Sequence, residues 1–500
     1  MGAARPPCGL GYLAQSLLEN GIEYAVEDLR GSHHLSALEA SIRRFQPDLI
    51  GVSLVSYGFK RSYALIRRIK ADYPQAAIVV GGPHVTVMGQ TVLRECPEID
   101  YGVVRDGEEV LVRLCQGAAS ERTPGLLYRL GDAVVSGGEP QAIADLDRIP
   151  FPRYVHFDLR RYAPEIPLIT SRGCPYRCTF CPNSLMRRQF IARSAANVVD
   201  EIEYWYGRGI RQFNVDDDNF TLVKERVSAI CDDIERRGLR GLFIRCANGV
   251  RADRVDRALL VRMREVGFSE VGIAADGGND RVLMQLAKKG ETIEAVERAI
   301  QDALAVGMKV KFFTILGHPG ETMNDIEDSF ALAQRYPFLR AQLYNPIPYP
   351  GTELFEWIRS HNAFLMPPEE YLNQVQDNEG ITPVFETPEL PAAVRRKILM
   401  RARRIERSVT RRATERMFRR LPVIGRIAAW GFATPLGQWM FFNNRIVRAV
   451  VDRIWYRKAL VSETPGASER PSSASIEQSD AGREPQGRVP PQTEDKGNHA

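Results

Sequence analysis

Five hundred residues, 44% of them hydrophobic, suffice for two or three packed domains and exclude a fibrous or wholly disordered chain. The eight cysteines lack the even framework of a disulfide-rich secreted domain, and we find neither a secretory signal nor an apolar run long enough to span a membrane. These features predict a cytoplasmic protein. The net charge of +5 conceals a local excess of ten positive charges between Arg395 and Arg420, which argues against general nucleic-acid binding and predicts one basic segment with its own partner.

Residues 1–135 alternate strand-like and helix-like patterns. Apolar runs at 48–55, 77–80 and 101–104 predict buried strands, and the stretches 9–20, 63–71 and 108–115 predict helices. This alternation implies a parallel sheet covered on both faces, as in a doubly wound, Rossmann-like α/β domain. Ligands of such sheets bind beyond the carboxyl ends of the strands, where Gly81 and Gly82 fall.

The start of this domain departs from the doubly wound pattern. Only a few residues precede Pro6-Pro7 and the first helix, whereas such a domain normally begins with a strand. We expect either that the start is truncated or that this sheet lacks a strand. Poor retention of the domain's ligand, cured by an extended N-terminus, would indicate truncation.

Residues 136–165 are rich in Pro, Gly and charge and are predicted to be a linker. Between residues 166 and 385 the alternation resumes at longer spacing. Strands are predicted at 168–171, 211–216, 241–246, 270–275, 309–316 and 340–345, with helices at 194–207, 223–237, 253–266, 279–287, 292–306 and 323–335. Six such units favour an open, partial (β/α)6 barrel of the TIM type, whose active site would gather at the carboxyl ends of the strands.

Residues 386–460 are predicted to form helices that are first basic and then apolar, and residues 461–500 a disordered tail. The basic stretch is either a solvated helix face or, with Trp430, Trp439 and Trp455 beyond it, a peripheral membrane contact at the inner face of the membrane. In a non-enzyme alternative, a membrane-associated scaffold, these helices would matter most. If replacing all three cysteines of the motif described next left function intact, that alternative would hold.

The spacing Cys174-x3-Cys178-x2-Cys181 directly follows a predicted strand. Three thiolates on one tight loop suit a [4Fe–4S] cluster and leave one iron open for a small molecule. The alternative is a zinc site, but a closed zinc site needs four ligands and no fourth Cys or His lies nearby. The spacing therefore predicts an iron–sulfur cluster.

With Phe180 just before the third cysteine, this loop resembles the signature of the radical S-adenosylmethionine (SAM) superfamily. The resemblance implies that the open iron chelates the amino and carboxylate groups of SAM, and that electron transfer then releases a 5′-deoxyadenosyl radical.

Polar residues after later strands extend the resemblance. Asp217 and Asp218 stand where relatives place an acidic stretch near the methionine amine, or they serve only as a solvated helix cap. Arg251 resembles a family arginine facing the carboxylate, or it is a surface residue. Asp276 replaces the glutamate that relatives usually carry, which leaves its contact to the cofactor open.

Two further segments match family patterns. The turn Gly317–Thr322 is predicted to be architectural and to start the next helix. Tyr349 lies in a family-like segment at the barrel mouth and is a candidate substrate contact. Of the remaining cysteines, Cys231 is predicted to be buried packing, whereas Cys246 ends a strand and could belong to the site.

The first domain resembles the cobalamin-binding domain that precedes the barrel in one large radical SAM subclass. The segments that carry this resemblance are Gly9–Ala14 and Gly81-Gly82-Pro83-His84, and they give Ser53, Gly81, Gly82 and His84 as candidate cobalamin contacts. The Asp-x-His-x-x-Gly pattern that supplies a lower cobalt ligand elsewhere does not occur in the sequence. We therefore predict that no protein imidazole binds cobalt.

Together these resemblances imply a radical enzyme that methylates an unactivated carbon of a biosynthetic intermediate through methylcobalamin. The alternative is a radical rearrangement, cyclisation or oxidation with the same cofactors. The expected partners are a small-molecule substrate, which a membrane-facing C-terminal region would make lipidic, and an electron donor such as flavodoxin or ferredoxin, but no nucleic acid. Substrate identity and oligomeric state stay open.

Overall fold

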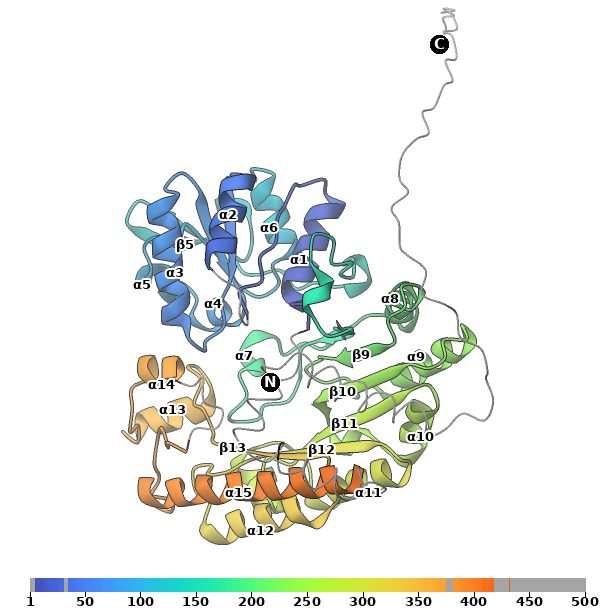
Figure 1. Ribbon diagram of the computed structural model, residues 1–500. Helices are drawn as coiled ribbons and strands as arrows, with labels where there is room; N and C mark the ends of the chain where they lie inside the picture. The colour runs from blue at the N-terminus through green and yellow to red at the C-terminus, as the bar shows by residue number, and fades with distance from the viewer. Residues whose placement is uncertain (1–4, 31–34, 375–380, 418–430, 432–500) are drawn as a thin grey trace, which may run out of the picture. The chain divides into compact units, whose positions relative to one another are not determined.

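The computed structural model describes residues 5–30, 35–374, 381–417 and 431. All of them fall in one compact unit, residues 1–448. The predicted tail and nearly all of the apolar part of the C-terminal region lie outside the described residues. Two main sheets organise the described chain, one in the N-terminal domain and one in the domain that follows (Figure 1).

The first sheet has the strand order β1-β2-β3-β4-β5. β1 (Leu49–Ser53), β2 (Ala77–Gly81) and β3 (Tyr101–Val103) pair in parallel, which confirms the predicted α/β domain. β4 (Leu126–Leu130) and β5 (Ala133–Ser136) add an antiparallel hairpin that sequence analysis missed. The helices of this domain are α1 (Cys8–Glu19), α2 (Leu35–Phe45), α3 (Phe59–Asp72), α4 (Pro83–Met88), α5 (Thr91–Glu95) and α6 (Glu108–Cys115).

The second sheet has six strands, and every neighbouring pair is parallel. The strands are β6 (Glu165–Leu168), β9 (Gln212–Val215), β10 (Phe243–Val250), β11 (Phe268–Ala274), β12 (Lys309–Ile315) and β13 (Arg340–Tyr344). Their order is β13-β12-β11-β10-β9-β6, with β6 and β13 at the edges. This open sheet confirms the predicted partial barrel.

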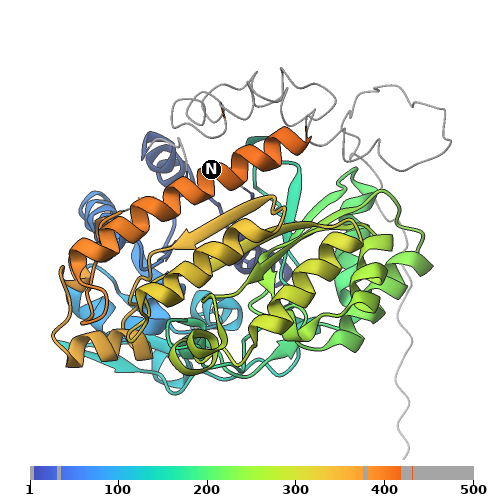
Figure 2. The same cartoon turned by 90° about the horizontal axis from the view of Figure 1, so that it is seen from below.

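Helices alternate with these strands and pack side by side along one face of the sheet (Figures 1 and 2). They are α8 (Ala195–Gly207), α9 (Lys224–Arg236), α10 (Arg257–Glu265), α11 (Ile293–Ala305) and α12 (Met323–Arg335). Ser194, Asp256 and Thr292 each accept a hydrogen bond from the third residue of the helix they precede, so local side-chain capping sets the starts of α8, α10 and α11.

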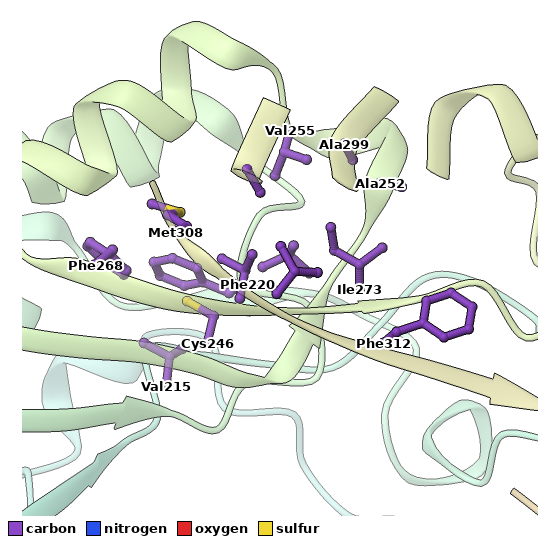
Figure 3. Close-up of a cluster of buried hydrophobic side chains, with 14 of the residues drawn as sticks. Val215, Phe220, Cys246, Ala252, Val255, Phe268, Ile273, Ala299, Met308 and Phe312 are labelled. Carbon is purple, nitrogen blue, oxygen red and sulfur yellow. The ribbon is translucent and has the colours of Figure 1, made fainter. Parts of the chain in front are cut away.

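The core of the second domain lies between the sheet and these helices (Figure 3). Strand β12 illustrates how this core forms. Its residues alternate between buried and half-buried positions, as a strand with one face in the core requires. Cys246 lies in this core beside Val215 and Phe220 (Figure 3), and Cys231 is buried there as well. Both cysteines are therefore packing residues in this structure.

The segment after β13 returns to the first domain. α13 (Glu353–Ser360) and α14 (Pro368–Gln374) contribute Leu354, Tyr371 and Leu372 to the core that α3 helps to form. The amide of Gly58 donates to the carbonyl of Leu372 at 2.9 Å. Residues that we assigned to the barrel thus complete the packing of the N-terminal domain.

Helix α15 (Ala392–Met417) carries the first part of the predicted basic region and lies along β13 and α12 (Figure 2). Its buried face holds Ile398, Ala402 and Ile405 in the same core as the barrel strands. Glu406 accepts a hydrogen bond from the amide of Leu343 in the edge strand at 2.7 Å. This helix therefore belongs to the second domain.

The remaining short elements are β7 (Ser171–Arg172), α7 (Asn183–Met186), β8 (Ile191–Ala192), a π-helix (Val282–Leu286) and 3-10 turns at Ser120–Arg122, Leu146–Arg148, Leu159–Arg161 and Ala252–Arg254. No described helix is long and apolar enough to cross a membrane.

Candidate active site at the carboxyl ends of the strands

The cysteine loop comprises residues 173–182, and one carboxylate holds the residues that directly precede it. Asp217 follows β9 and accepts hydrogen bonds from the amide and hydroxyl of Thr170 and from the hydroxyl of Ser171, each at 2.6 Å. The side chain of Asp217 is buried, and Arg226 lies 3.7 Å away. Because these partners engage both of its oxygens, Asp217 positions the loop, and a direct contact with SAM stays a prediction.

The neighbouring carboxylate, Asp218, is exposed and borders the large cavity described below. It accepts hydrogen bonds from the amide of Gly173 at 2.9 Å and the side-chain amide of Asn183 at 2.8 Å. Of the two predicted acidic residues, Asp218 is therefore the one that a ligand can reach.

The far end of the loop is clamped through Thr179, which stands between Cys178 and Phe180. Its amide donates to the carbonyl of Ala287 at 3.0 Å and its hydroxyl to the carbonyl of Leu286 at 3.1 Å, where the π-helix ends. Its carbonyl accepts the amide of Leu354, at the start of α13. The loop is thus fixed at its start and, through Thr179, toward its far end.

The three cysteines of the loop are free and half-buried. Burial raises the pKa of Cys178 to about 12 and that of Cys181 to about 11, so neither would be a thiolate near neutral pH without a metal. Among the described residues, no three His, Cys, Asp or Glu side chains close around a single metal ion. A cubane needs a different arrangement, since each cysteine binds a separate iron, and the donor set on this loop fits that group.

A buried charge network lies beside the loop. Lys289, 6% exposed, donates to the carboxylate of Asp276 at 2.7 Å and lies 3.5 Å from Glu291. Arg251 lies 3.3 Å from Glu291 and holds its guanidinium carbon 3.5 Å from the ring centre of Tyr176 in the cysteine loop. The opposite charges of Asp276 and Glu291 raise the pKa of Lys289 despite burial, which keeps it cationic.

Asp276 itself has a left-handed backbone, with φ of 60°. Its carbonyl faces Nε2 of the buried His318 at 3.0 Å, and the ring of His318 lies 5.6 Å from that of Phe180. Lys289 and His318 therefore hold Asp276 in this strained conformation, and His318 also contacts Phe180 of the cysteine loop.

The turn after β12 has the predicted architectural role. The carboxylate of Glu321 accepts the amides of Gly317 at 2.6 Å and His318 at 2.7 Å. Thr322 then caps α12 in a reciprocal pair with Asp325. Burial raises the pKa of Glu321 to about 7.

The candidate cobalamin residues lie at the carboxyl ends of β1 and β2. Ser53, Gly81 and Gly82 line a cavity of about 970 Å³, which Arg172, Gly173 and Arg187 border from the side of the cysteine loop. At Gly82, with φ of 101°, a Cβ atom would approach the carbonyl oxygen of Leu54 to 2.7 Å. We call Ser53, Gly81 and Gly82 the glycine edge of the first sheet. This edge opens onto a cavity of the size that ligands occupy, so these residues fit cobalamin, the group that the resemblance implies.

His84 is turned away from that cavity. It is 1% exposed, its Nε2 lies 3.1 Å from the hydroxyl of Tyr63, and its Nδ1 lies 3.3 Å from that of Ser56. Burial lowers the pKa of His84 to about 4. Both ring nitrogens have partners within the domain, so a direct cobalamin contact stays a prediction that this geometry does not favour.

Ion pairs join the N-terminal domain to the side of the cavity wall that carries the cysteine loop. Arg172, two residues before Cys174, contacts Asp106 at 2.7 Å and Glu108 at 2.6 Å, both from the N-terminal domain. Arg187 also contacts Asp106, and its carbonyl accepts the amide of Cys174 at 3.1 Å. The first domain therefore helps to hold the first cysteine in place.

Sequence analysis missed several of these residues. Thr170, Tyr176, Thr179, Lys289 and Glu291 act through long-range contacts that no local spacing encodes. A weak signal existed for Lys289, because two lysines and a glycine follow a short helix at the carboxyl side of a predicted strand. Tyr349 was named, and its ring meets that of Tyr57 from the first domain at 5.8 Å.

Comparisons with known proteins identify the domain of the cysteine loop and the N-terminal domain. The model described as "Radical SAM superfamily" matches residues 168–333, and the "B12 binding domain" model matches residues 2–115. The chain carries a radical SAM domain and a B12-binding domain. Its cofactors are therefore a [4Fe–4S] cluster, SAM and cobalamin, which sets the zinc alternative aside.

This radical SAM protein is 29% identical to an uncharacterized methyltransferase of Pyrococcus horikoshii, over 73% of the chain and 81% of the relative. It is 27% identical to the cytidylyl-2-hydroxyethylphosphonate methyltransferase of Streptomyces wedmorensis, over 75% of the chain and 81% of the relative. Its fold resembles the methyltransferase TsrM from Kitasatospora setae, solved with cobalamin and a [4Fe–4S] cluster, with a TM-score of 0.66 over 80% of this chain and 88% of that one at 20% identity.

Proposed function

We propose that this enzyme is a cobalamin-dependent radical SAM methyltransferase that methylates an unactivated carbon of a small biosynthetic intermediate. The observation that carries the proposal is the shared cavity, which has Ser53 at the end of β1 and Gly81 and Gly82 at the end of β2 on one side and Gly173 of the cysteine loop on the other. The relatives reported above are named methyltransferases, and this supports methyl transfer over rearrangement, cyclisation or oxidation.

When bound, the cluster and SAM supply a carbon radical and cobalamin supplies the methyl group. The chain's own residues hold and shield these groups. Cys174, Cys178 and Cys181 would bind the cluster, and Asp218 and the network around Lys289 would meet the charged end of SAM. Gly82 would let cobalamin approach the backbone closely. Hydrogen abstraction by a radical needs no general base, so no catalytic histidine is required.

Anaerobic reconstitution with iron, sulfide and cobalamin tests the proposal. A methylated product should appear with one equivalent each of S-adenosylhomocysteine and 5′-deoxyadenosine, whereas a rearrangement gives 5′-deoxyadenosine without S-adenosylhomocysteine. Replacing the three loop cysteines with alanine should abolish cluster absorption and both by-products. Cys115→Ser, which removes an exposed thiol on α6, is the matched control and should change neither. SAM cleavage without S-adenosylhomocysteine would contradict methyl transfer.

We also propose an external electron donor, such as flavodoxin or ferredoxin, and a peripheral contact of α15 with anionic lipid headgroups, which would suit a lipidic substrate. The outer face of α15 exposes Arg396, Lys397, Arg404 and Arg407, for which no ion pair occurs among the described residues. Clustered cations attract anionic membranes by roughly 1 kcal/mol per residue.

Deleting α15 would uncover the core, so charge removal is the better test of the membrane contact. Changing the four exposed cations to glutamine should abolish co-sedimentation with phosphatidylglycerol vesicles and leave unfolding unchanged. Arg401→Gln is the control, because Arg401 is already paired with Glu327. Equal binding to neutral phosphatidylcholine vesicles would contradict an electrostatic contact.

A further inference from the structure

The carboxyl end of β3 brings an arginine to the cavity that the glycine edge borders. Arg105 lies two residues beyond β3, is exposed, and lines this cavity together with Gly81 and Gly82. The two other arginines of the lining, Arg172 and Arg187, already face carboxylates. For the guanidinium of Arg105, in contrast, the described residues supply neither an ion pair nor a hydrogen bond.

The backbone of Arg105 has a conformation that arginine rarely adopts. Its φ is 69°, in the left-handed region that glycine, asparagine and aspartate populate more readily. Its amide donates to the hydroxyl of Thr86 at 2.9 Å, and the same hydroxyl donates to the carbonyl of Gly82 at 3.2 Å. One side chain therefore ties this strained residue to the glycine edge. Backbone strain of this kind gathers at ligand sites, where it helps to present a side chain.

The carboxylates that follow Arg105 in the sequence do not neutralise it. Asp106 pairs with both Arg172 and Arg187, and Glu108 pairs with Arg172. These contacts point the two carboxylates toward the cysteine loop and leave the guanidinium of Arg105 to the cavity. A guanidinium presents a planar fork of N–H donors that matches the oxygens of a phosphate or a carboxylate. The side chain is therefore suited to an anionic group on a ligand.

Cobalamin, which the proposed function seats on the glycine edge, has one group of matching charge. Its peripheral side chains are neutral amides, whereas the phosphodiester that leads to its nucleotide tail is negative. Because Gly82 and Arg105 share the hydroxyl of Thr86, a cofactor that approaches the backbone of Gly82 comes beside Arg105. The charged end of SAM, in contrast, belongs with Asp218 and the network around Lys289. The position of Arg105 therefore favours the phosphodiester of cobalamin as its partner.

We propose that Arg105 binds the phosphodiester of cobalamin through a bidentate, charge-assisted contact and thereby positions the cofactor on the glycine edge. The inference rests on the cobalamin site of the proposed function and does not depend on methyl transfer. An anionic group of the substrate would offer the same chemistry to the guanidinium. The experiment is therefore designed to separate these two sources of the anion.

Equilibrium dialysis of the cluster-loaded protein, without SAM or substrate, compares methylcobalamin with methylcobinamide, which lacks the phosphodiester and the nucleotide. Arg105→Gln should weaken the binding of methylcobalamin about tenfold to a hundredfold, the usual effect of losing a hydrogen bond to a charged group, and leave methylcobinamide unaffected. Added salt should weaken methylcobalamin binding more steeply in the wild type than in the variant. Arg61→Gln is the matched control, because Arg61 is an exposed cation of α3 outside the cavity, and it should change neither affinity.

Arg105→Gly separates the side chain from the backbone strain. Glycine adopts a φ of 69° without strain, so this variant should unfold at a higher urea concentration than the wild type and Arg105→Gln. It should nevertheless bind methylcobalamin as weakly as Arg105→Gln does. A loss of affinity in a variant of raised stability cannot be attributed to unfolding.

Equal weakening of methylcobalamin and methylcobinamide in Arg105→Gln would overturn the contact with the phosphodiester. Unchanged affinity for methylcobalamin would overturn it as well. If calorimetry then showed inorganic phosphate binding to the wild type but not to Arg105→Gln, the anion would belong to the substrate. A wild-type protein that retains neither corrinoid would contradict the cobalamin site together with this proposal, whereas methyl transfer is tested separately by its two by-products.

Discussion

The cysteine loop and the glycine edge of the first sheet face the same cavity, but they are built in opposite ways. Side chains that reach across the fold, above all Asp217 and Thr179, fix the cysteine loop. The glycine edge depends on backbone shape at Gly82 and on β1, which pairs with no strand other than β2 among the described residues. The comparison indicates that side-chain contacts preform the cysteine loop, whereas the cobalamin side of the cavity depends on the backbone of the first sheet.

The largest effect should come from Asp217→Asn. The change removes a buried charge that accepts three hydrogen bonds and leaves Arg226 without its partner, at a cost of roughly 3–5 kcal/mol in the free energy of unfolding. Urea unfolding and iron content after reconstitution should both fall. Asp218→Asn, in an exposed side chain, should leave the unfolding free energy nearly unchanged. Wild-type values for Asp217→Asn would show that the loop does not depend on this carboxylate.

Acid should weaken the first domain through His84. Its pKa is about 4 when folded and near 6.5 when unfolded, so the unfolded chain binds the proton more readily between these values. The stabilising contribution is complete above pH 6.5 and is lost as the pH falls to 4, by on the order of 3 kcal/mol. Urea titrations from pH 7 to pH 4 should show a smaller loss in His84→Gln, and parallel curves would contradict this account.

The same histidine bears on the cobalt ligand. Because Tyr63 and Ser56 occupy both ring nitrogens, we expect no histidine hyperfine splitting in the electron paramagnetic resonance spectrum of bound cob(II)alamin. Such splitting, if it were lost in His84→Gln, would refute the prediction that no imidazole binds cobalt.

Gly82→Ala should cost about 1–3 kcal/mol, because φ of 101° with ψ of −174° is a conformation reserved for glycine. Cobalamin binding should weaken with it, whereas iron content should stay at the wild-type level. Thermal unfolding, equilibrium dialysis with cobalamin and iron analysis measure the three effects. Equal loss of iron would show that the two halves of the site are not separable in this way.

The smallest effect should come from Gly51→Ala on the open strand. A Cβ atom there would meet only Val79, at 3.8 Å, and alanine loses less conformational freedom than glycine on folding. We expect a gain of about 0.5–1 kcal/mol in the unfolding free energy. A loss would indicate that the side of β1 facing the cavity is more crowded than the structure shows.

Sequence reasoning predicted the parts of this fold that depend on local pattern. Five of the six barrel strands and the glycine strand end at Gly81 were found, and the first barrel strand was predicted three residues too late, at 168–171 instead of Glu165–Leu168. The hairpin of β4 and β5 was missed because its short strands, joined at Gly131-Asp132, lie beside the Pro- and Gly-rich stretch that we took for a linker. The site was harder to predict, since Lys289 and Thr179 owe their roles to chain segments that fold back from far along the sequence.

The return of residues 353–385 to the first domain has a consequence for how the molecule can be divided. Leu354, Tyr371 and Phe385 share a buried cluster with Phe59 and Tyr63 of the first domain. A fragment cut at the apparent linker would therefore expose part of its own interior. Although the two family models match separate stretches of the sequence, the chain beyond the second stretch packs into the core of the first domain. The two domains therefore cannot be exchanged as independent units.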